Sequence, residues 1–166
     1  MIYKKILKTA SVAALSLLLT VTSVQSNDEV KFKTLDGKIV NLADYKGKWV
    51  IVNYWATWCP PCRVEMPELS LFHDEHKDKD AIVLGVNYES ITTGKVKAFL
   101  SEQMIEFPVV QEINGPNGRS TSLGPLKGLP TTYMVSPEGE LLATRVGMVN
   151  QKMLEGFIAK YNEMKK

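Results

Sequence analysis

The only two cysteines of the 166-residue chain, Cys59 and Cys62, are separated by two prolines. An apolar run typical of a strand, residues 49–55, precedes the pair, and a run of helical character follows it from Arg63. We therefore expect the pair where a buried strand ends and a helix begins. The first turn of a helix offers unpaired N–H groups and the positive end of the helix dipole, which stabilise a thiolate. Thiol–disulfide exchange needs this arrangement, because the thiolate is the attacking species.

In this interpretation, Cys59 lies at the exposed helix start and attacks, while Cys62 lies one turn further in, more shielded, and resolves the mixed disulfide. Three other chemistries fit less well. A structural zinc site usually needs four ligands, and covalent haem attachment needs histidine where Arg63 stands. A purely structural disulfide remains an alternative, although so small a loop restricts the unfolded chain little.

Four neighbours of the cysteines are expected to shape the site. Trp55 and Trp58 flank the pair, and we expect them to pack beside it and to offer apolar contact to a docking partner. Pro60 and Pro61 lie between the cysteines, where they remove backbone donors and stiffen the loop.

Residues 1–26 have the pattern of an export signal. Three early lysines precede an uncharged run, 9–24, that is rich in leucine, valine and alanine, and cleavage is predicted just before Asn27. A retained membrane anchor is the alternative, although a spanning helix needs about 20 apolar residues. The chain is thus predicted to work in the periplasm or another extracytoplasmic compartment, where disulfides persist.

The charge balance excludes one class of partner. Without the three lysines of the signal, the chain keeps 17 basic and 18 acidic residues, a net charge of −1. Such a balance predicts no nucleic-acid binding.

Residues 27–166 suit one domain of alternating strands and helices, an α/β fold. A hairpin is predicted around Asp36-Gly37, and a final helix is predicted to begin after Asn150 as its N-cap. Segment 114–127, rich in glycine, proline and serine, is predicted to hold one short helix and a loop. The other predicted elements are strands 30–34, 38–42, 48–55, 81–87, 131–136 and 140–146, and helices 61–77 and 93–104.

The motifs resemble those of a known superfamily. Trp58-Cys59-Pro60-Pro61-Cys62-Arg63, with Glu65, Pro67 and the distant segment 128–132, is similar to the thioredoxin superfamily, and most of all to the TlpA/ResA-like extracytoplasmic thiol–disulfide oxidoreductases of the cytochrome c maturation type. The resemblance covers most of residues 30–160. It implies a thioredoxin fold: a central mixed β-sheet flanked by helices, with an N-terminal β-hairpin extension.

The resemblance gives Pro130 a role. It implies a cis peptide bond opposite the dithiol, where Pro130 excludes metal and, with Leu129 and Thr131, presents backbone groups to an extended segment of a partner. The alternative from the residues alone is a trans proline that opens a strand.

Two further positions concern protons. Asn53 stands where cytosolic thioredoxins carry a buried aspartate that moves the proton of the inner thiol, and an amide does not ionise. Glu65, one turn after Cys62, matches the glutamate of the ResA-like subgroup, so it is predicted to exchange protons with Cys62. An exposed first-turn acid is the alternative for Glu65. Glu89 is expected near the dithiol at a strand end.

No metal and no small-molecule cofactor are predicted. His73 and His76 lie one turn apart, and we expect them on a solvated face rather than on a metal. The partners implied by the resemblance are disulfide-bearing proteins, such as apocytochrome c, another thiol protein or an oxidised oxidoreductase, and a membrane thiol-reductant donor.

Two rival functions remain open. A copper chaperone of the Sco type has the same fold, but it uses a Cys-x-x-x-Cys spacing and a distant histidine, whereas this chain has one residue fewer between its cysteines. The second rival, a disulfide oxidase or isomerase, uses the same thiol–disulfide chemistry. The direction of electron flow depends on relative thiolate stability.

Overall fold

The computed structural model describes residues 30–117 and 120–166. The predicted export signal, residues 1–26, lies outside the described residues. No helix in the described ranges is long and apolar enough to cross a membrane. Their elements are, in chain order, β1 (Lys31–Thr34), β2 (Ile39–Asn41), a 3-10 helix (Leu42–Tyr45), β3 (Trp49–Trp55), α1 (Pro60–His76), β4 (Ala81–Asn87), α2 (Thr93–Glu102), β5 (Val109–Glu112), β6 (Ser120–Thr121), β7 (Gly124–Pro125), β8 (Thr131–Val135), β9 (Leu141–Val146) and α3 (Gln151–Met164).

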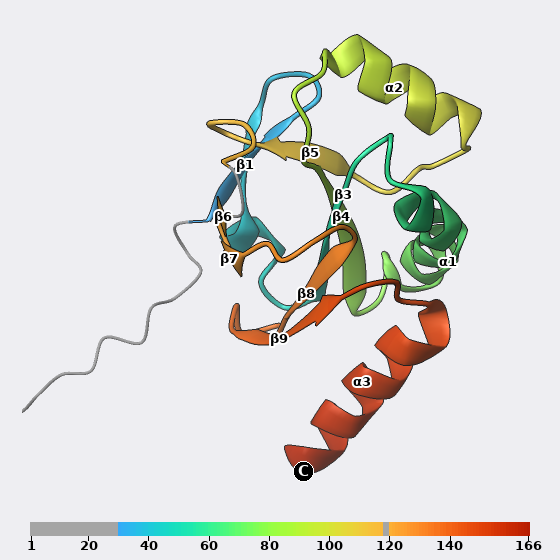
Figure 1. The fold of residues 1–166 in the computed structure, drawn as a ribbon. Coiled ribbons are helices and arrows are strands. Elements are labelled where there is room, and N and C mark those ends of the chain that lie inside the picture. The colour runs from blue at the N-terminus through green and yellow to red at the C-terminus, as the bar shows by residue number, and fades with distance from the viewer. Residues whose placement is uncertain (1–29, 118–119) are drawn as a thin grey trace, which may run out of the picture.

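Seven strands form one mixed sheet in the order β2-β1-β5-β4-β3-β8-β9 (Figure 1). β3 pairs with β4 in parallel on one edge and with β8 in antiparallel on the other. All residues of β3 and β4 are buried, as expected of parallel strands that are covered on both faces. The predicted α/β architecture, a central mixed sheet flanked by helices with an N-terminal hairpin, is confirmed.

The two faces of the sheet are covered differently. All three α-helices pack on one face, through buried side chains such as Leu69 of α1, Val96 of α2 and Leu154 of α3. Figure 1 shows these helices gathered on the same side of the strands. On the other face, the 3-10 helix and the segment after β7 contribute Leu42 and Leu126 to a second cluster. The sheet is therefore enclosed on both sides, although only one side carries α-helices.

The N-terminal hairpin forms around Asp36-Gly37, as predicted. Thr34 N donates to Lys38 O at 2.8 Å, and Gly37 has a φ of +85°, which glycine adopts without a steric penalty. β1 also pairs antiparallel with β5, so the hairpin extends the main sheet.

Helix α3 begins at the predicted cap. Asn150 Oδ1 accepts a hydrogen bond from Met153 N at 2.9 Å. Further along α3, Phe157 and Tyr161 meet the ring of Trp49 edge-on, with centroids 5.9 and 5.1 Å away. Trp49 opens β3, so these contacts tie α3 to the central strand and fix the segment just before the helix.

Two parts of the fold differ from the sequence prediction. The short helix predicted in 114–127 is wrong: the described residues of that segment form the strand pair β6 and β7 instead. Thr121 Oγ1 donates to Gly124 O and accepts from Leu123 N, and such side-chain bonds to the backbone compete with helix formation. Strand β5 is not predicted by the sequence pattern. Its four residues are too few to show a period, and it pairs with β1 and β4 rather than forming a hairpin with the next strand, as β1 does with β2.

Candidate active site

The two cysteines lie where β3 gives way to α1, as predicted, and they form a disulfide. Cys59 is the N-cap of α1, and its Sγ accepts a hydrogen bond from Cys62 N at 3.3 Å. Pro60 and Pro61 occupy the first two helical positions, where a missing N–H costs no intrahelical bond. An orphan N–H at the helix start therefore points at the outer sulfur, where it would stabilise a thiolate.

The exposure of Cys59 corrects the expectation of an open helix start. Only 2% of Cys59 is exposed, compared with 0% of Cys62. The surrounding turn and loops cover most of the outer cysteine. The outer sulfur is therefore accessible only through a small opening between the neighbouring side chains.

The two flanking tryptophans lie in opposite environments. Trp55 is fully buried and stacks on Phe99, with ring centroids 5.4 Å apart. Trp58, next to Cys59, is 67% exposed. This placement corrects the expectation for Trp55: it packs within the core beside the dithiol, and only Trp58 has surface to offer a partner.

The peptide bond between Leu129 and Pro130 is cis, as predicted. The register of β3 with β8 pairs Tyr54 with Thr131, so the proline lies beside the strand end that leads to the cysteines. Thr131 is fully buried, and its hydroxyl donates to Gly128 O at 2.7 Å. The side chain of Thr131 therefore holds the proline loop in shape, and the use of its backbone groups by a partner stays a prediction.

A shallow hollow lies between Trp58 and the proline loop. Its volume is about 360 Å³, and Tyr88, Pro116, Leu126, Lys127, Gly128 and Leu129 line it together with Trp58. Most of these side chains are apolar, and Lys127 supplies one positive charge. The hollow thus presents a largely apolar surface next to Trp58, the neighbour of Cys59 in the sequence.

Glu65 is buried rather than exposed in the first turn of the helix. Only 2% of the residue is exposed. Its Oε1 accepts from Asn53 Nδ2 at 2.8 Å and its Oε2 accepts from Val149 N at 2.9 Å. Burial raises the pKa of Glu65 from 4.5 to about 7, although the bonds from Val149 and Asn53 oppose the rise. Glu65 can therefore gain or lose a proton near neutral pH, one turn from Cys62.

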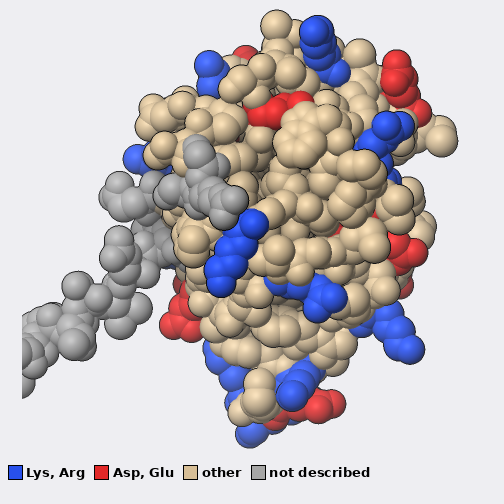
Figure 2. Space-filling model, viewed as in Figure 1, with Lys and Arg blue, Asp and Glu red and all other residues tan. Residues whose placement is uncertain are grey.

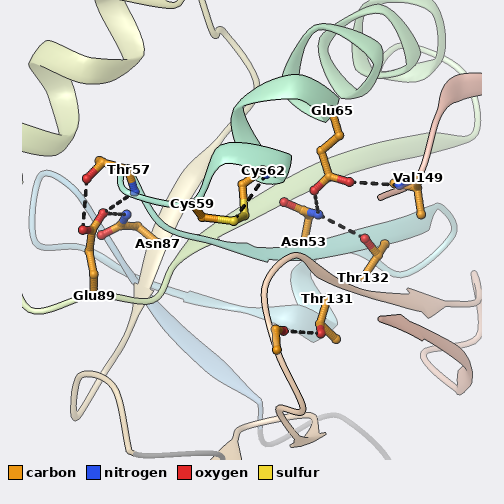
Figure 3. The surroundings of a disulfide bond; sticks show 11 residues. Asn53, Thr57, Cys59, Cys62, Glu65, Asn87, Glu89, Thr131, Thr132 and Val149 are labelled. Atoms are coloured by element: carbon orange, nitrogen blue, oxygen red, sulfur yellow. Dashed lines mark hydrogen bonds between the residues drawn. A yellow bond between two sulfur atoms is a disulfide. The ribbon is translucent and has the colours of Figure 1, made fainter. Parts of the chain in front are cut away.

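A second carboxylate lies on the other side of the disulfide from Glu65 (Figure 3). Glu89 accepts from Thr57 N at 2.7 Å, from Thr57 Oγ1 at 3.0 Å and from Asn87 Nδ2 at 2.8 Å. Thr57 belongs to the turn before Cys59, so the expectation that Glu89 lies near the dithiol is confirmed. Its bonds brace the turn that carries Trp58 and Cys59.

His73 corrects the expectation of a solvated histidine pair. It is 7% exposed, and its Nδ1 accepts from Val83 N at 3.1 Å. Burial, with a smaller effect of Lys77, lowers the pKa of His73. Both histidines lie in the last part of α1, and eleven helical residues place His73 roughly 16 Å along the axis from Cys62. Neither histidine can therefore join the cysteines around one copper ion.

The surface charges follow the near-neutral composition. On the face shown in Figure 2, basic side chains lie apart from one another, with acidic side chains among them. This face carries no continuous basic stripe in the part of the chain that is described.

Sequence reasoning misses two parts of the Glu65 site. Thr132 Oγ1 accepts from Asn53 Nδ2 at 3.0 Å, and Val149 contributes only a backbone N–H. A backbone donor leaves no mark on residue type, so Val149 has no signal in the sequence. Thr132 has an indirect signal, because it belongs to the proline segment and the strand register pairs it with Asn53.

The raised pKa of Glu65 predicts a pH-dependent stability. A folded-state pKa of about 7 against 4.5 means that the folded protein holds this proton more tightly than the unfolded chain does. The resulting stabilisation is complete below pH 4.5 and is lost as the pH rises through 7. Relative to Glu65→Gln, the free energy of unfolding of the oxidised wild type should fall by roughly 3 kcal/mol between pH 4 and pH 8, measured by urea denaturation. Parallel pH curves for the two proteins would mean that Glu65 titrates as a solvated acid.

The comparisons with known proteins agree with this geometry. Residues 25–144 match the model of the AhpC/TSA family. A thiol-disulfide oxidoreductase ResA from Oceanobacillus iheyensis is 36% identical over 124 residues, which are 75% of this chain and 62% of that relative. The ResA of Bacillus thuringiensis is 33% identical over 130 residues, 76% of this chain and 70% of the relative. In the crystal structure of a DsbF homologue from Corynebacterium diphtheriae, which is 28% identical, the match covers 81% of this chain and 85% of that one with a TM-score of 0.70. The chain has a thioredoxin-like fold and belongs to the AhpC/TSA family, among relatives of the ResA type.

Proposed function

We propose that this protein is an exported thiol–disulfide oxidoreductase that reduces disulfides in selected partner proteins. The observation that carries the proposal is the Cys59–Cys62 disulfide at the start of α1, in which a helix N–H points at the outer sulfur and the inner sulfur is buried. The ResA relatives support the same chemistry. The signal-like pattern of residues 1–26 supports export.

The proposed reaction starts from the reduced dithiol. The Cys59 thiolate attacks one sulfur of the partner's disulfide, which forms a mixed disulfide and expels the first partner thiolate. The Cys62 thiolate then attacks Cys59 Sγ, which expels the second partner thiolate and leaves the Cys59–Cys62 disulfide. The partner gains two electrons and two protons. A membrane thiol-reductant donor, itself oxidised to a disulfide, returns them to this protein.

Glu65 is proposed to carry the proton of Cys62. Cys62 must lose its proton before it attacks, and Asn53 has no ionisable group to receive it. Glu65 lies one helical turn away, is buried, and changes protonation near neutral pH. The carboxylate takes the proton as Cys62 attacks and gives one back when the dithiol is restored.

Partner proteins are proposed to dock on Trp58 and the hollow beside it. Trp58 is exposed next to a nearly buried Cys59, so a partner that reaches the sulfur must cover the indole. The cis-proline segment forms the opposite rim through Leu129. Candidate partners are apocytochrome c, another thiol protein or an oxidised oxidoreductase.

The division of labour between the thiols predicts different trapping by the two serine variants. Cys62→Ser should accumulate mixed disulfides with partner proteins, because the resolving thiol is missing. Cys59→Ser should trap roughly tenfold less, because Cys62 is buried and does not reach the partner. Non-reducing electrophoresis of thiol-quenched samples measures both. Equal trapping by the two variants, or trapping by Cys59→Ser alone, would contradict the assignment of Cys59 as the attacking thiol.

Trp58→Ala should weaken partner docking without slowing the chemistry of the dithiol. Loss of a large exposed aromatic contact should raise the KM for a protein substrate roughly tenfold. The rate with a small aromatic disulfide reagent should change little, because that reagent does not need the docking surface. Leu71→Ala, at an exposed apolar residue of α1 that does not line the hollow, is the matched control. A loss of rate that is equal for both substrates would instead indicate damage to the site.

Equilibration of the protein with dithiothreitol and glutathione tests the direction of electron flow. A reductant should have a potential closer to the value of about −270 mV of thioredoxin than to the value of about −120 mV of a strong oxidant.

Glu65→Gln removes a negative charge near Cys62, so Cys62 should lose its proton at lower pH and the potential should become less negative. The pH profile of exchange should flatten near pH 7. If the thiol titrations and the reduction potentials of the wild type and Glu65→Gln superimpose, Glu65 does not carry the proton of Cys62, and water or Glu89 must carry it.

A further inference from the structure

The side chain of Asn53 is fully buried, but only half of its amide is bonded. Its Nδ2 donates to Glu65 Oε1 at 2.8 Å and to Thr132 Oγ1 at 3.0 Å (Figure 3). Its Oδ1 has no partner in the described part of the chain. A buried amide oxygen without a donor costs free energy, so this orientation needs a reason.

The ionised form of Glu65 supplies that reason. A carboxylate is an acceptor only, and here both of its oxygens receive a donor, one from Asn53 and one from Val149 N. A protonated carboxyl also carries an O–H group, and that hydrogen needs an acceptor. The N–H of Val149 belongs to the backbone and cannot become an acceptor. The amide of Asn53 can, because a half-turn about its last side-chain bond exchanges Nδ2 and Oδ1 with almost no change in shape.

We infer that Asn53 is a positioning residue whose amide turns over when Glu65 gains or loses its proton. With Glu65 ionised, Nδ2 donates to Oε1, as the structure shows. With Glu65 protonated, the Oε1 hydroxyl donates to Oδ1, while Val149 N still donates to Oε2. The hydroxyl of Thr132 accepts from Nδ2 in the first state and donates to Oδ1 in the second. The inference rests on the proposed role of Glu65 as proton carrier.

Asparagine suits position 53 better than an aspartate or an apolar side chain would. An aspartate would compete with Glu65 for the proton, because two close carboxylates share one. An apolar side chain would leave the carboxyl with the Val149 bond alone. An amide of this size offers both a donor and an acceptor to the same carboxyl oxygen, and unlike a carboxylate it does not titrate. Glu65 can then change protonation without any movement of the backbone around it.

The other groups around Glu65 leave Asn53 as the side chain that can respond. From its own helix, Cys62 lies one turn away and titrates only when the disulfide is reduced. Within the described part of the chain, the pKa of Glu65 responds to burial, to the bond from Val149 and to the bond from Asn53. On β9, Arg145 stands opposite Thr132 in the register, but its Nε donates to Met148 O at 3.0 Å.

Nuclear magnetic resonance of the oxidised wild-type protein tests the inference directly. The carboxyl carbon of Glu65 gives the midpoint of its titration between pH 5 and pH 9. Nuclear Overhauser contacts from the side-chain amide protons of Asn53 to Thr132 and Glu65 should be strong above that midpoint. They should weaken below it with the same midpoint, because Nδ2 turns away. Contacts that stay constant through the midpoint would overturn the inference and make Asn53 a fixed donor.

Two controls separate the turnover from a general response to pH. In Glu65→Gln the contacts of Asn53 should not change with pH, since nothing at that position titrates. Asn87 is an internal control, because it also donates to a buried carboxylate, Glu89, and also has an unpartnered oxygen. Two bonds from Thr57 hold Glu89 as an acceptor as well, so the contacts of Asn87 should stay constant.

A variant tests the coupling between Asn53 and Glu65, on which the turnover depends. Asn53→Asp keeps the shape but replaces the donor by a carboxylate oxygen, so the Glu65 midpoint should rise by about one pH unit or more, a tenfold gain in proton affinity. An unchanged midpoint would overturn the inference. If the amide turns over while Glu65→Gln leaves thiol exchange unchanged, the positioning role stands and the proposed proton carrier fails. If the amide stays fixed while Glu65→Gln alters thiol exchange, Glu65 stands as the proton carrier and the turnover of Asn53 fails.

Discussion

The register of the central strand β3 is the constraint on which the site depends. β3 is bonded on both edges, so it cannot slip without breaking its ladders with β4 and β8 together. One residue after β3 the turn toward Cys59 begins, and opposite its end stands the start of β8, directly after Pro130. The same pairing sets Asn53 against Thr132. A single set of backbone bonds thus brings the cysteines, the proline segment and the proton site together.

Burial of Glu65 is the unfavourable part of this arrangement. A carboxylate away from water loses hydration, and within the described residues two donors, Asn53 Nδ2 and Val149 N, replace that hydration. Those donors come from β3 and from the segment before α3, so the strand and the last helix must both be in place. Trp49, at the other end of β3, meets α3 through Phe157 and Tyr161. The packing that anchors α3 therefore also fixes the Val149 N–H, which keeps the carboxyl bonded.

The two carboxylates beside the disulfide have different environments and different uses. Glu89 receives three donors, two of them from Thr57, and acts as a brace for the turn before Cys59. Glu65 receives two, and burial moves its pKa into the neutral range. A carboxyl that is held firmly as an acceptor shapes the site, whereas one that is poised between two protonation states can exchange a proton with the thiol.

The sequence by itself determined the strand–helix junction at Cys59, the hairpin around Asp36-Gly37 and the start of α3 at Asn150, and its resemblance to the thioredoxin superfamily implied the cis bond before Pro130. Each of these is a local pattern, or a motif whose residue types already carry the information. The sequence did not predict β5, the strand pair that replaces the expected helix in 114–127, or the burial of Cys59 and His73. These depend on which segments of the chain come to lie over which others. Tertiary structure alone decided that Glu65 meets the N–H of Val149, 84 residues later, because a backbone donor is present at nearly every position and only packing selects one.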